Sequence, residues 1–185
     1  MRCEVCGSTF YARAGARFCS GRCRVANHRR SDGPPAELTR EPRWVVHRKK
    51  VPFTTGRIFA SSTRPSSWCD YTTARAALAD KRGQFDGVGF VLNGDGIACL
   101  DLDDCLHDGV LEAWAQEIVD RCPRTYIEIS PSGHGLHVFG YATVGKGRIG
   151  QVEVYDRARY ICITGRRFGS FPRRLADISA VVASV

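Results

Sequence analysis

An apolar run that ends in two acidic residues constrains the fold of this chain more than any other segment. Residues 97–100 read Ile-Ala-Cys-Leu, and Asp101-Leu102-Asp103 follows directly. Successive side chains of a β-strand point to opposite faces, so Asp101 and Asp103 share one face of a sheet. By the same alternation, Glu153 lies on the opposite face from the two valines that flank it. Three carboxylates gathered on one sheet face are the ligands that two magnesium ions need for an in-line attack on a phosphate.

Length and hydropathy limit the architecture. The 185 residues suffice for one domain with a core plus a small appendage. No apolar run approaches the length of a membrane span, and the first residues, Met1-Arg2-Cys3-Glu4, lack the apolar segment of a signal peptide. We therefore expect a cytoplasmic protein with no membrane partner.

The net charge of +8 is distributed unevenly along the chain. Residues 1–60 contain thirteen Lys and Arg against four Asp and Glu, whereas residues 61–185 contain fourteen against fifteen. A basic first third suggests a polyanionic partner, and arginines clustered around a cysteine module favour nucleic acid.

Four of the nine cysteines lie within the first 23 residues, as Cys3-x-x-Cys6 and Cys19-x-x-x-Cys23 separated by twelve residues. This spacing predicts a structural zinc site, in which the metal supplies the folding energy of a segment too short to have its own core. His28 is an alternative fourth ligand if Cys23 is free. The other five cysteines are scattered, which indicates a reducing compartment rather than a disulfide framework.

The composition along the chain predicts two domains. Residues 1–30 form a zinc module, and residues 31–42 form a linker because Pro34, Pro35 and Pro42 disfavour regular structure. Residues 43–185 form the second, larger domain.

In the larger domain the patterns predict an α+β fold. A helix is expected over residues 71–81 with Asp70 or Thr72 as its N-cap, and an amphipathic helix over residues 111–122. The turn Asn93-Gly94-Asp95-Gly96 predicts a hairpin that pairs strand 87–92 with strand 97–101. Further elements are expected as strands 44–46, 125–129, 136–141, 151–155 and 160–164, a flexible loop 145–150, and a short helix within 175–183. We expect a mostly antiparallel sheet with the two long helices on one face and a site on the other.

A turn of small residues, Ser130-Pro131-Ser132-Gly133, precedes strand 136–141. Its amides can face an anion. His137 alternates with apolar neighbours, so it faces the carboxylates if the two strands are adjacent, and there it can bind a phosphate oxygen. A histidine satisfied within the core remains the alternative for His137, and a solvated turn residue is the favoured interpretation of His134.

Three short motifs, in this order, resemble those of the archaeo-eukaryotic primase superfamily, and specifically the primase-polymerases of phages and plasmids. They are Cys99-Leu100-Asp101-Leu102-Asp103, Ser132-Gly133-His134-Gly135-Leu136-His137 and Val152-Glu153-Val154-Tyr155. The resemblance covers roughly residues 43–165, and residues 159–165 look like the family's next strand. Separately, residues 18–30 resemble the small four-cysteine zinc ribbons of bacterial and phage DNA-acting proteins, whose arginines, here Arg22, Arg24, Arg29 and Arg30, would contact phosphates.

The resemblance implies a catalytic palm related to the RNA-recognition fold. It implies that Asp101, Asp103 and Glu153 hold catalytic Mg²⁺ or Mn²⁺. The residues that it places at the phosphates of an incoming nucleotide are Ser132, Gly133 and His137, with Lys50 and Arg159 as further candidates.

The implied activity is template-directed nucleotidyl transfer to a 3′-hydroxyl, with DNA and nucleoside triphosphates as partners. The sequence lacks the Gly-x-x-x-x-Gly-Lys-Ser/Thr loop of a helicase motor, so a replicative helicase is expected in trans. Little sequence follows Gly165, so we expect the helical priming domain to be absent, reduced, or supplied by another chain. Two alternatives stay open: a metal-dependent phosphodiesterase or nuclease, and a non-catalytic zinc-containing DNA-binding accessory protein.

Overall fold

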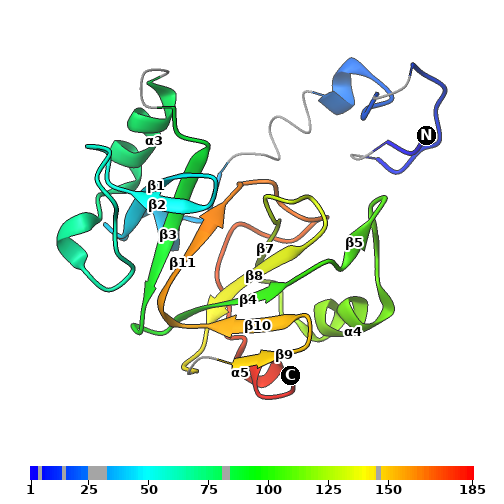
Figure 1. The fold of residues 1–185 in the computed structure, drawn as a ribbon. Helices are drawn as coiled ribbons and strands as arrows, with labels where there is room; N and C mark the ends of the chain where they lie inside the picture. The colour runs from blue at the N-terminus through cyan, green and yellow to red at the C-terminus, as the bar shows by residue number, and fades with distance from the viewer. Residues whose placement is uncertain (4–5, 14–15, 25–32, 81–83, 145–146) are drawn as a thin grey trace.

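The computed structural model describes residues 1–3, 6–13, 16–24, 33–80, 84–144 and 147–185. Within these residues the chain is an α+β protein built on antiparallel sheets (Figure 1). Four cysteines form a cluster near the N-terminus. The expected α+β class is therefore confirmed. No helix among the described residues is long and apolar enough to cross a membrane.

The strands divide into two main sheets, in which every pairing is antiparallel. The smaller sheet has the spatial order β11-β3-β1-β2, with β1 at Trp44–Arg48, β2 at Val51–Phe53, β3 at Gly87–Asn93 and β11 at Arg157–Ile163. The larger sheet has the order β7-β8-β4-β10-β9, with β4 at Ile97–Leu102, β7 at Tyr126–Ile129, β8 at Leu136–Tyr141, β9 at Gly147–Ile149 and β10 at Val152–Tyr155. A small hairpin joins β5 (Leu106–His107) to β6 (Val110–Leu111).

Short helices complete the fold. They are α2 at Ala36–Thr39, the 3₁₀ turn η1 at Pro65–Ser67, α3 at Tyr71–Ala79, α4 at Ala113–Arg121 and α5 at Ser179–Val182. Asp70 is the N-cap of α3, as predicted, because its Oδ1 accepts the backbone N–H of Thr73 at 2.8 Å. Helix α4 begins later than predicted, since Leu111 belongs to β6, and α5 is shorter than expected.

The alternation of strand residues places two apolar clusters on the two faces of the larger sheet. On one face, Leu100 and Val138 pack with Ile118 of α4 and Ile178 beside α5. The opposite face meets the smaller sheet through a second cluster, which includes Cys99, Tyr126, Phe139, Phe90, Ile161 and Ala74 of α3. Strands buried on both faces explain why these segments read as nearly continuous apolar runs.

The expected single sheet with both long helices on one face is therefore wrong. Helix α4 packs against the larger sheet and α3 against the smaller one. The predicted pairing of strands 87–92 and 97–101 is also wrong, although the chain does turn at Gly94 and Gly96 with positive φ angles of 86° and 95°. The two strands enter different sheets because β3 is already paired with β1 and β11, and β4 with β8 and β10.

Two segments expected to be irregular contain regular structure. The predicted loop 145–150 contains β9, which pairs with β10, while residues 145 and 146 lie outside the described part of the chain. The predicted linker 31–42 contains α2, and residues 33–42 pack onto the larger domain. Leu38 is fully buried in the cluster between the sheets, and its carbonyl accepts the indole N–H of Trp44 at 3.1 Å. The prolines bound a short helix here, since Pro35 occupies its N-cap.

We predict that Leu38→Ala lowers the free energy of unfolding of the larger domain by about 2–5 kcal/mol, because it removes a fully buried side chain and leaves a cavity. Urea denaturation followed by tryptophan fluorescence measures this cost. Arg40→Ala, an exposed change two residues away, is the control and should stay within about 0.5 kcal/mol of the wild type. An unchanged unfolding midpoint for Leu38→Ala would show that this segment is a true linker.

Candidate functional site

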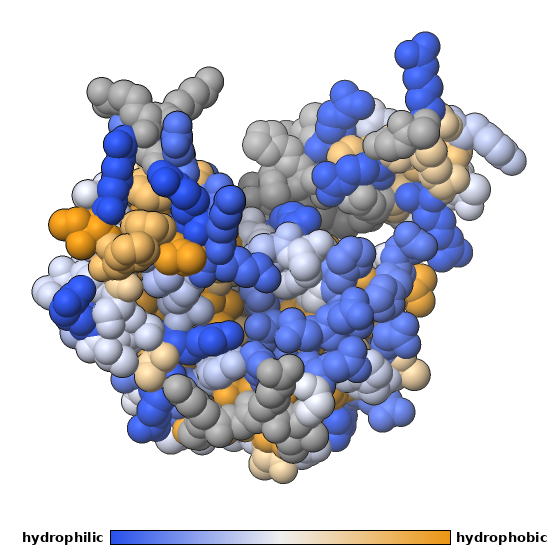
Figure 2. Space-filling view, viewed as in Figure 1, coloured by the Kyte–Doolittle hydropathy of each residue, from blue (hydrophilic) through white to orange (hydrophobic). Residues whose placement is uncertain are grey.

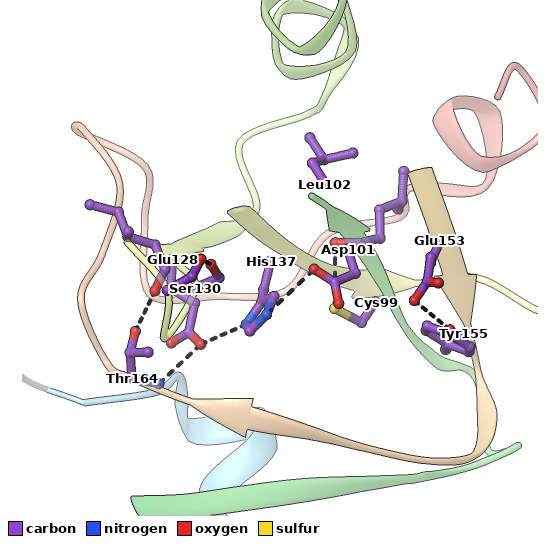
Figure 3. A network of polar contacts seen from close by, with 12 residues as sticks. Cys99, Asp101, Leu102, Glu128, Ser130, His137, Glu153, Tyr155 and Thr164 are labelled. Atoms are coloured by element: carbon purple, nitrogen blue, oxygen red, sulfur yellow. Dashed lines mark hydrogen bonds and ion pairs between the residues drawn. The ribbon is translucent and has the colours of Figure 1, made fainter. Parts of the chain in front are cut away.

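The functional candidates form a row across the larger sheet. Strand register places Glu153 of β10 directly opposite Asp101 of β4, Asp101 opposite His137 of β8, and His137 opposite Glu128 of β7 (Figure 3). Directly opposed residues on adjacent antiparallel strands have neighbouring side chains on the same face. Asp103 follows the end of β4, where it is exposed and its backbone N–H donates to the carbonyl of Gln151 at 2.9 Å. The structure thus brings the three predicted carboxylates and His137 to one end of one sheet face.

His137 lies between two carboxylates. Its Nδ1 is 3.1 Å from Glu128 Oε1, and its Nε2 is 3.6 Å from Asp101 Oδ1. Burial by itself lowers the pKa of His137, but the hydrogen bond and charge of Glu128, with the charges of Asp101 and Asp103, raise the pKa above its ordinary value. The two carboxylates therefore favour the protonated form of the imidazole and fix the orientation of its ring.

Glu128 anchors this arrangement, and the sequence analysis missed it. The side chain is fully buried and accepts hydrogen bonds from Tyr126 Oη at 2.8 Å, the Thr164 amide at 3.1 Å and the Gly165 amide at 2.9 Å, besides facing His137. A buried carboxylate is tolerated only with such partners. The sequence does show Glu128 as the one acidic residue in the apolar strand Tyr-Ile-Glu-Ile. This pattern predicts a buried carboxylate with polar partners, but it does not identify those partners.

The pKa of Asp101 is raised from its ordinary value of 3.8. Burial is the largest cause, and the like charges of Asp103 and Glu153 add to it, while His137 and Arg159 act in the opposite direction. A raised pKa means that ionised Asp101 destabilises the folded chain. This cost is absent below the ordinary value, where the group is protonated in both folded and unfolded chains, and is complete above the raised pKa.

Arg159 reaches the row from the other sheet. Its Nη2 lies 3.7 Å from Glu153 Oε2, and its guanidinium lies 4.6 Å from the centre of the Tyr155 ring. The Tyr155 hydroxyl donates to the same Glu153 oxygen at 2.5 Å (Figure 3). Arg159 of β11 pairs with Leu92 of β3, and Leu92 lies in the apolar cluster between the two sheets. The packing of the two sheets therefore brings Arg159 close to the carboxylates.

The donor set suits a hard divalent cation. Carboxylate oxygens are the ligands that Mg²⁺ and Mn²⁺ prefer, and besides burial the like charges of Asp103 and Glu153 raise the pKa of Asp101. Asp101 and Glu153 are directly opposed in the strand register, and Asp103 lies one residue beyond the end of β4.

Lys50 and Arg159 line one hollow of about 460 Å³, although they are far apart in the sequence. The other lining residues are Pro52, Ala60, Ser61, Ser62, Ala158 and Tyr160. Lys50 lies in the turn between β1 and β2, where the Tyr160 hydroxyl donates to its carbonyl. The structure thus places two basic residues at one hollow, and one of them, Arg159, also lies 3.7 Å from Glu153.

Ser132 and Gly133 occupy the tight turn between β7 and β8. Ser132 Oγ is 3.0 Å from Ser130 Oγ and accepts the His134 amide at 3.2 Å, and Gly133 has a φ of +85°. The turn packs closely on the end of β4, since a Cβ atom on Gly135 would lie 2.7 Å from the Leu102 carbonyl oxygen. The structure therefore places this turn beside the end of β4, just before Asp103, and Ser132 and Gly133 form hydrogen bonds within the turn.

The four cysteines near the N-terminus form a second, separate cluster. Cys19 Sγ lies 3.6 Å from Cys6 Sγ and 3.5 Å from Cys23 Sγ, and Cys3 Sγ accepts the Cys19 amide at 3.4 Å. Four thiolates on a tetrahedral zinc ion lie about 3.8 Å apart, given a Zn–S distance of about 2.3 Å. Hydrogen bonds with Cys23 and Cys6 raise the pKa of Cys19 to about 12, because the crowded thiols cannot all ionise without a cation. The cluster can bind a metal such as zinc; His28 lies outside the described residues.

The described residues thus form an α+β protein that carries a carboxylate and histidine row beside a cationic hollow, together with a four-cysteine cluster. No protein-family model matches the chain. A similar protein is the DNA Primase-polymerase of Nitratiruptor phage NrS-1, which is 35% identical over 152 residues, or 71% of this chain and 20% of that relative. The chain spans about a fifth of the length of this relative.

We predict that Glu128→Ala costs about 3–5 kcal/mol of folding free energy, because it leaves the buried His137 ring and two amides without their partner. Glu128→Gln should cost less, since it keeps one acceptor oxygen, and urea denaturation compares the two. Glu117→Ala on the exposed face of α4 is the matched control. Equal stability of Glu128→Ala and Glu117→Ala would contradict the anchoring role.

For the cysteine cluster we expect about one zinc ion per purified chain, measured by mass spectrometry of the metal content. Cys19→Ser should lower this content, because the serine hydroxyl is a poor substitute for a thiolate ligand. Cys122→Ser, which changes a cysteine of α4's C-cap, should retain the full content. A Cys3→Ser/Cys19→Ser double variant that still carried one zinc per chain would rule out this ligand set.

Proposed function

We propose that this chain contains the catalytic palm of a DNA primase-polymerase, which transfers nucleotides to a 3′-hydroxyl under the direction of a template. The observation that carries the proposal is the row of Glu153, Asp101 and His137 on three adjacent strands, with Asp103 at the end of the row. This row consists of the residues that the three motifs single out, and the similarity to a phage DNA Primase-polymerase supports the same activity.

The topology of the larger sheet supports an RNA-recognition type of palm. In a β-α-β-β-α-β unit of that type, the first strand lies between the third and the fourth. Strands β4, β7, β8 and β10 take these four positions, and α4 connects the first to the second. A connection that contains β9 replaces the second helix.

In the proposed reaction Asp101, Asp103 and Glu153 would hold two divalent metal ions, which would supply activation of the attacking hydroxyl and neutralise charge on the phosphates. His137 keeps its Nδ1 on Glu128 and offers its Nε2 to a phosphate oxygen of the incoming nucleotide. Its fixed orientation means that no ordering is needed when the substrate binds.

The hollow beside Glu153 is the proposed position of the triphosphate. Lys50 and Arg159 line it and provide positive charge, and Arg159 already lies at the boundary between the hollow and the carboxylates. The turn at Ser132 and Gly133 is proposed to contact the nucleotide from the opposite end of the row.

The N-terminal module is proposed to hold DNA near this site. Arg22 and Arg24 are exposed beside Cys23, where they can contact phosphates, while Arg29 and Arg30 lie outside the described residues. A replicative helicase acting in trans and a location in the cytoplasm of a bacterial host belong to the same proposal.

We predict that the Asp101→Asn/Asp103→Asn double variant loses nucleotide addition to a primed DNA template, in magnesium and in manganese, because it removes the proposed metal ligands. Its melting temperature in a chelator at neutral pH should equal or exceed that of the wild type, since ionised Asp101 destabilises the fold. Asp104→Asn/Asp108→Asn is the matched control, because both residues are exposed and asparagine tolerates their positive φ angles. Labelled primers resolved by electrophoresis measure the addition.

His137→Ala should raise the KM for the nucleotide more than it lowers kcat. Extension at the wild-type rate by the Asp101→Asn/Asp103→Asn variant would refute the proposal. Metal-dependent shortening of the DNA without any extension would point to a nuclease, and binding without either reaction would point to an accessory protein.

A further inference from the structure

The hairpin of β1 and β2 and the segment after it carry an exposed patch that the proposed chemistry does not use. Its hydrophobic members are Val51, Ile58 and Phe59, whose exposed fractions are 41%, 69% and 68%. Four exposed basic residues surround them: Arg48, Lys49, Lys50 and Arg57. We call these seven residues the hairpin patch. Figure 2 shows hydrophobic surface over this part of the molecule with hydrophilic side chains beside it.

Ring stacking and backbone hydrogen bonds hold the aromatic centre of the patch in place. Phe59 forms a bridge with Phe53 of β2, and their rings stack with centroids 4.9 Å apart and planes at 27°. Backbone hydrogen bonds from Thr54 to Ile58 at 2.7 Å and from Ala60 to Pro52 at 3.0 Å close this short hairpin. One face of Phe59 is therefore fixed against Phe53 while most of the side chain stays in water. A rigid, exposed apolar surface of this kind marks an interaction site.

The positive charge around Phe53 and Phe59 indicates what kind of partner the patch binds. Residues 48–64 contain five Lys and Arg and no Asp or Glu. The Arg48 guanidinium lies 5.9 Å from the centre of the Phe53 ring and 6.0 Å from that of Phe85, so a cation is held directly beside the aromatic surface. A surface that combines positive charge with an exposed aromatic face fits a polyanion that also offers flat rings.

The patch is continuous with the proposed catalytic site. Lys50 belongs to the patch and also lines the hollow with Arg159, whose Nη2 lies 3.7 Å from Glu153. Pro52 and Ala60, which form the closing backbone contact of the hairpin, line the same hollow. A strand lying on the patch would therefore lead toward the carboxylate row.

We propose that the hairpin patch binds single-stranded nucleic acid, with a base stacked on the exposed face of Phe59 and phosphates held by Lys49 and Arg57. This inference deepens the proposed function, because it assigns the patch to the unpaired template strand. A duplex hides its base faces, whereas a single strand offers both bases for stacking and phosphates for charge contacts. A protein partner could bind the apolar residues, but it would not explain why residues 48–64 contain five Lys and Arg and no Asp or Glu.

The first test uses the full chain and a fluorescently labelled single-stranded oligonucleotide, without nucleotide or divalent metal. Phe59→Ala should weaken binding about five- to a hundredfold, the loss expected for one base stacked on an aromatic ring. Phe59→Trp should restore it. Tyr141→Ala, an aromatic residue of β8 that is 43% exposed and lies outside the patch, should bind as the wild type does.

An abasic oligonucleotide separates stacking from charge. Because it has phosphates but no bases, the wild type and Phe59→Ala should bind it equally. A Lys49→Asn/Arg57→Asn variant should instead lower the slope of log affinity against log salt by about 1.4, the value for two phosphate contacts on a single strand. Asparagine is chosen because both positions have positive φ angles, 49° and 67°. Arg121→Gln on α4 is the charge control and should leave the slope unchanged.

Wild-type affinity of Phe59→Ala for the normal oligonucleotide, with an unchanged melting temperature, would overturn this inference and leave the patch to a protein partner. An equal loss on the abasic oligonucleotide would also overturn it. The proposed function fails separately, if the wild-type chain adds no nucleotide. Stacking on Phe59 in a chain without nucleotide addition would support the inference while refuting the polymerase proposal.

Discussion

The buried carboxylate of Glu128 is the interaction on which the candidate site depends. Burying an ionised group costs several kcal/mol unless partners surround it, and Glu128 meets this condition with the Tyr126 hydroxyl, two backbone amides and the His137 ring. The amides of Thr164 and Gly165 follow β11, the edge strand of the smaller sheet. One side chain of the larger sheet thus fixes the orientation of His137 and ties the two sheets together.

Charges of alternating sign extend from this anchor. Glu128 contacts His137 and raises its pKa, His137 faces Asp101, and Arg159 faces Glu153 from the other sheet. His137 and Arg159 act to lower the pKa of Asp101, yet burial first, and the like charges of Asp103 and Glu153 second, still raise it. A bound cation would favour ionised Asp101 and so relieve a cost that the folded chain already carries.

The packing of two sheets explains how surfaces distant in sequence come to adjoin the row. Strand β11 brings Arg159 to Glu153, and the turn after β1 brings Lys50 to the same hollow. The hairpin patch then continues from Lys50 along the edge of the smaller sheet. The carboxylates therefore lie on one sheet and most of the neighbouring positive charge on the other, which is a suitable arrangement for holding a nucleotide and a strand between them.

The sequence by itself determined the features that depend on local geometry. Strand alternation predicts that Asp101 and Asp103 share a face and that Glu153 opposes its valine neighbours, and cysteine spacing predicts the N-terminal cluster. The tertiary structure decided everything that depends on which segments pair: the division into two sheets, the packing of Leu38 from the predicted linker, the partners of Glu128, and the meeting of Lys50 with Arg159. The physical reason is that side-chain alternation and turn formation depend on residues close together in the sequence, whereas strand pairing depends on segments that are far apart in it. Strands β3 and β4, for example, are joined by a short turn but pair with different strands in different sheets.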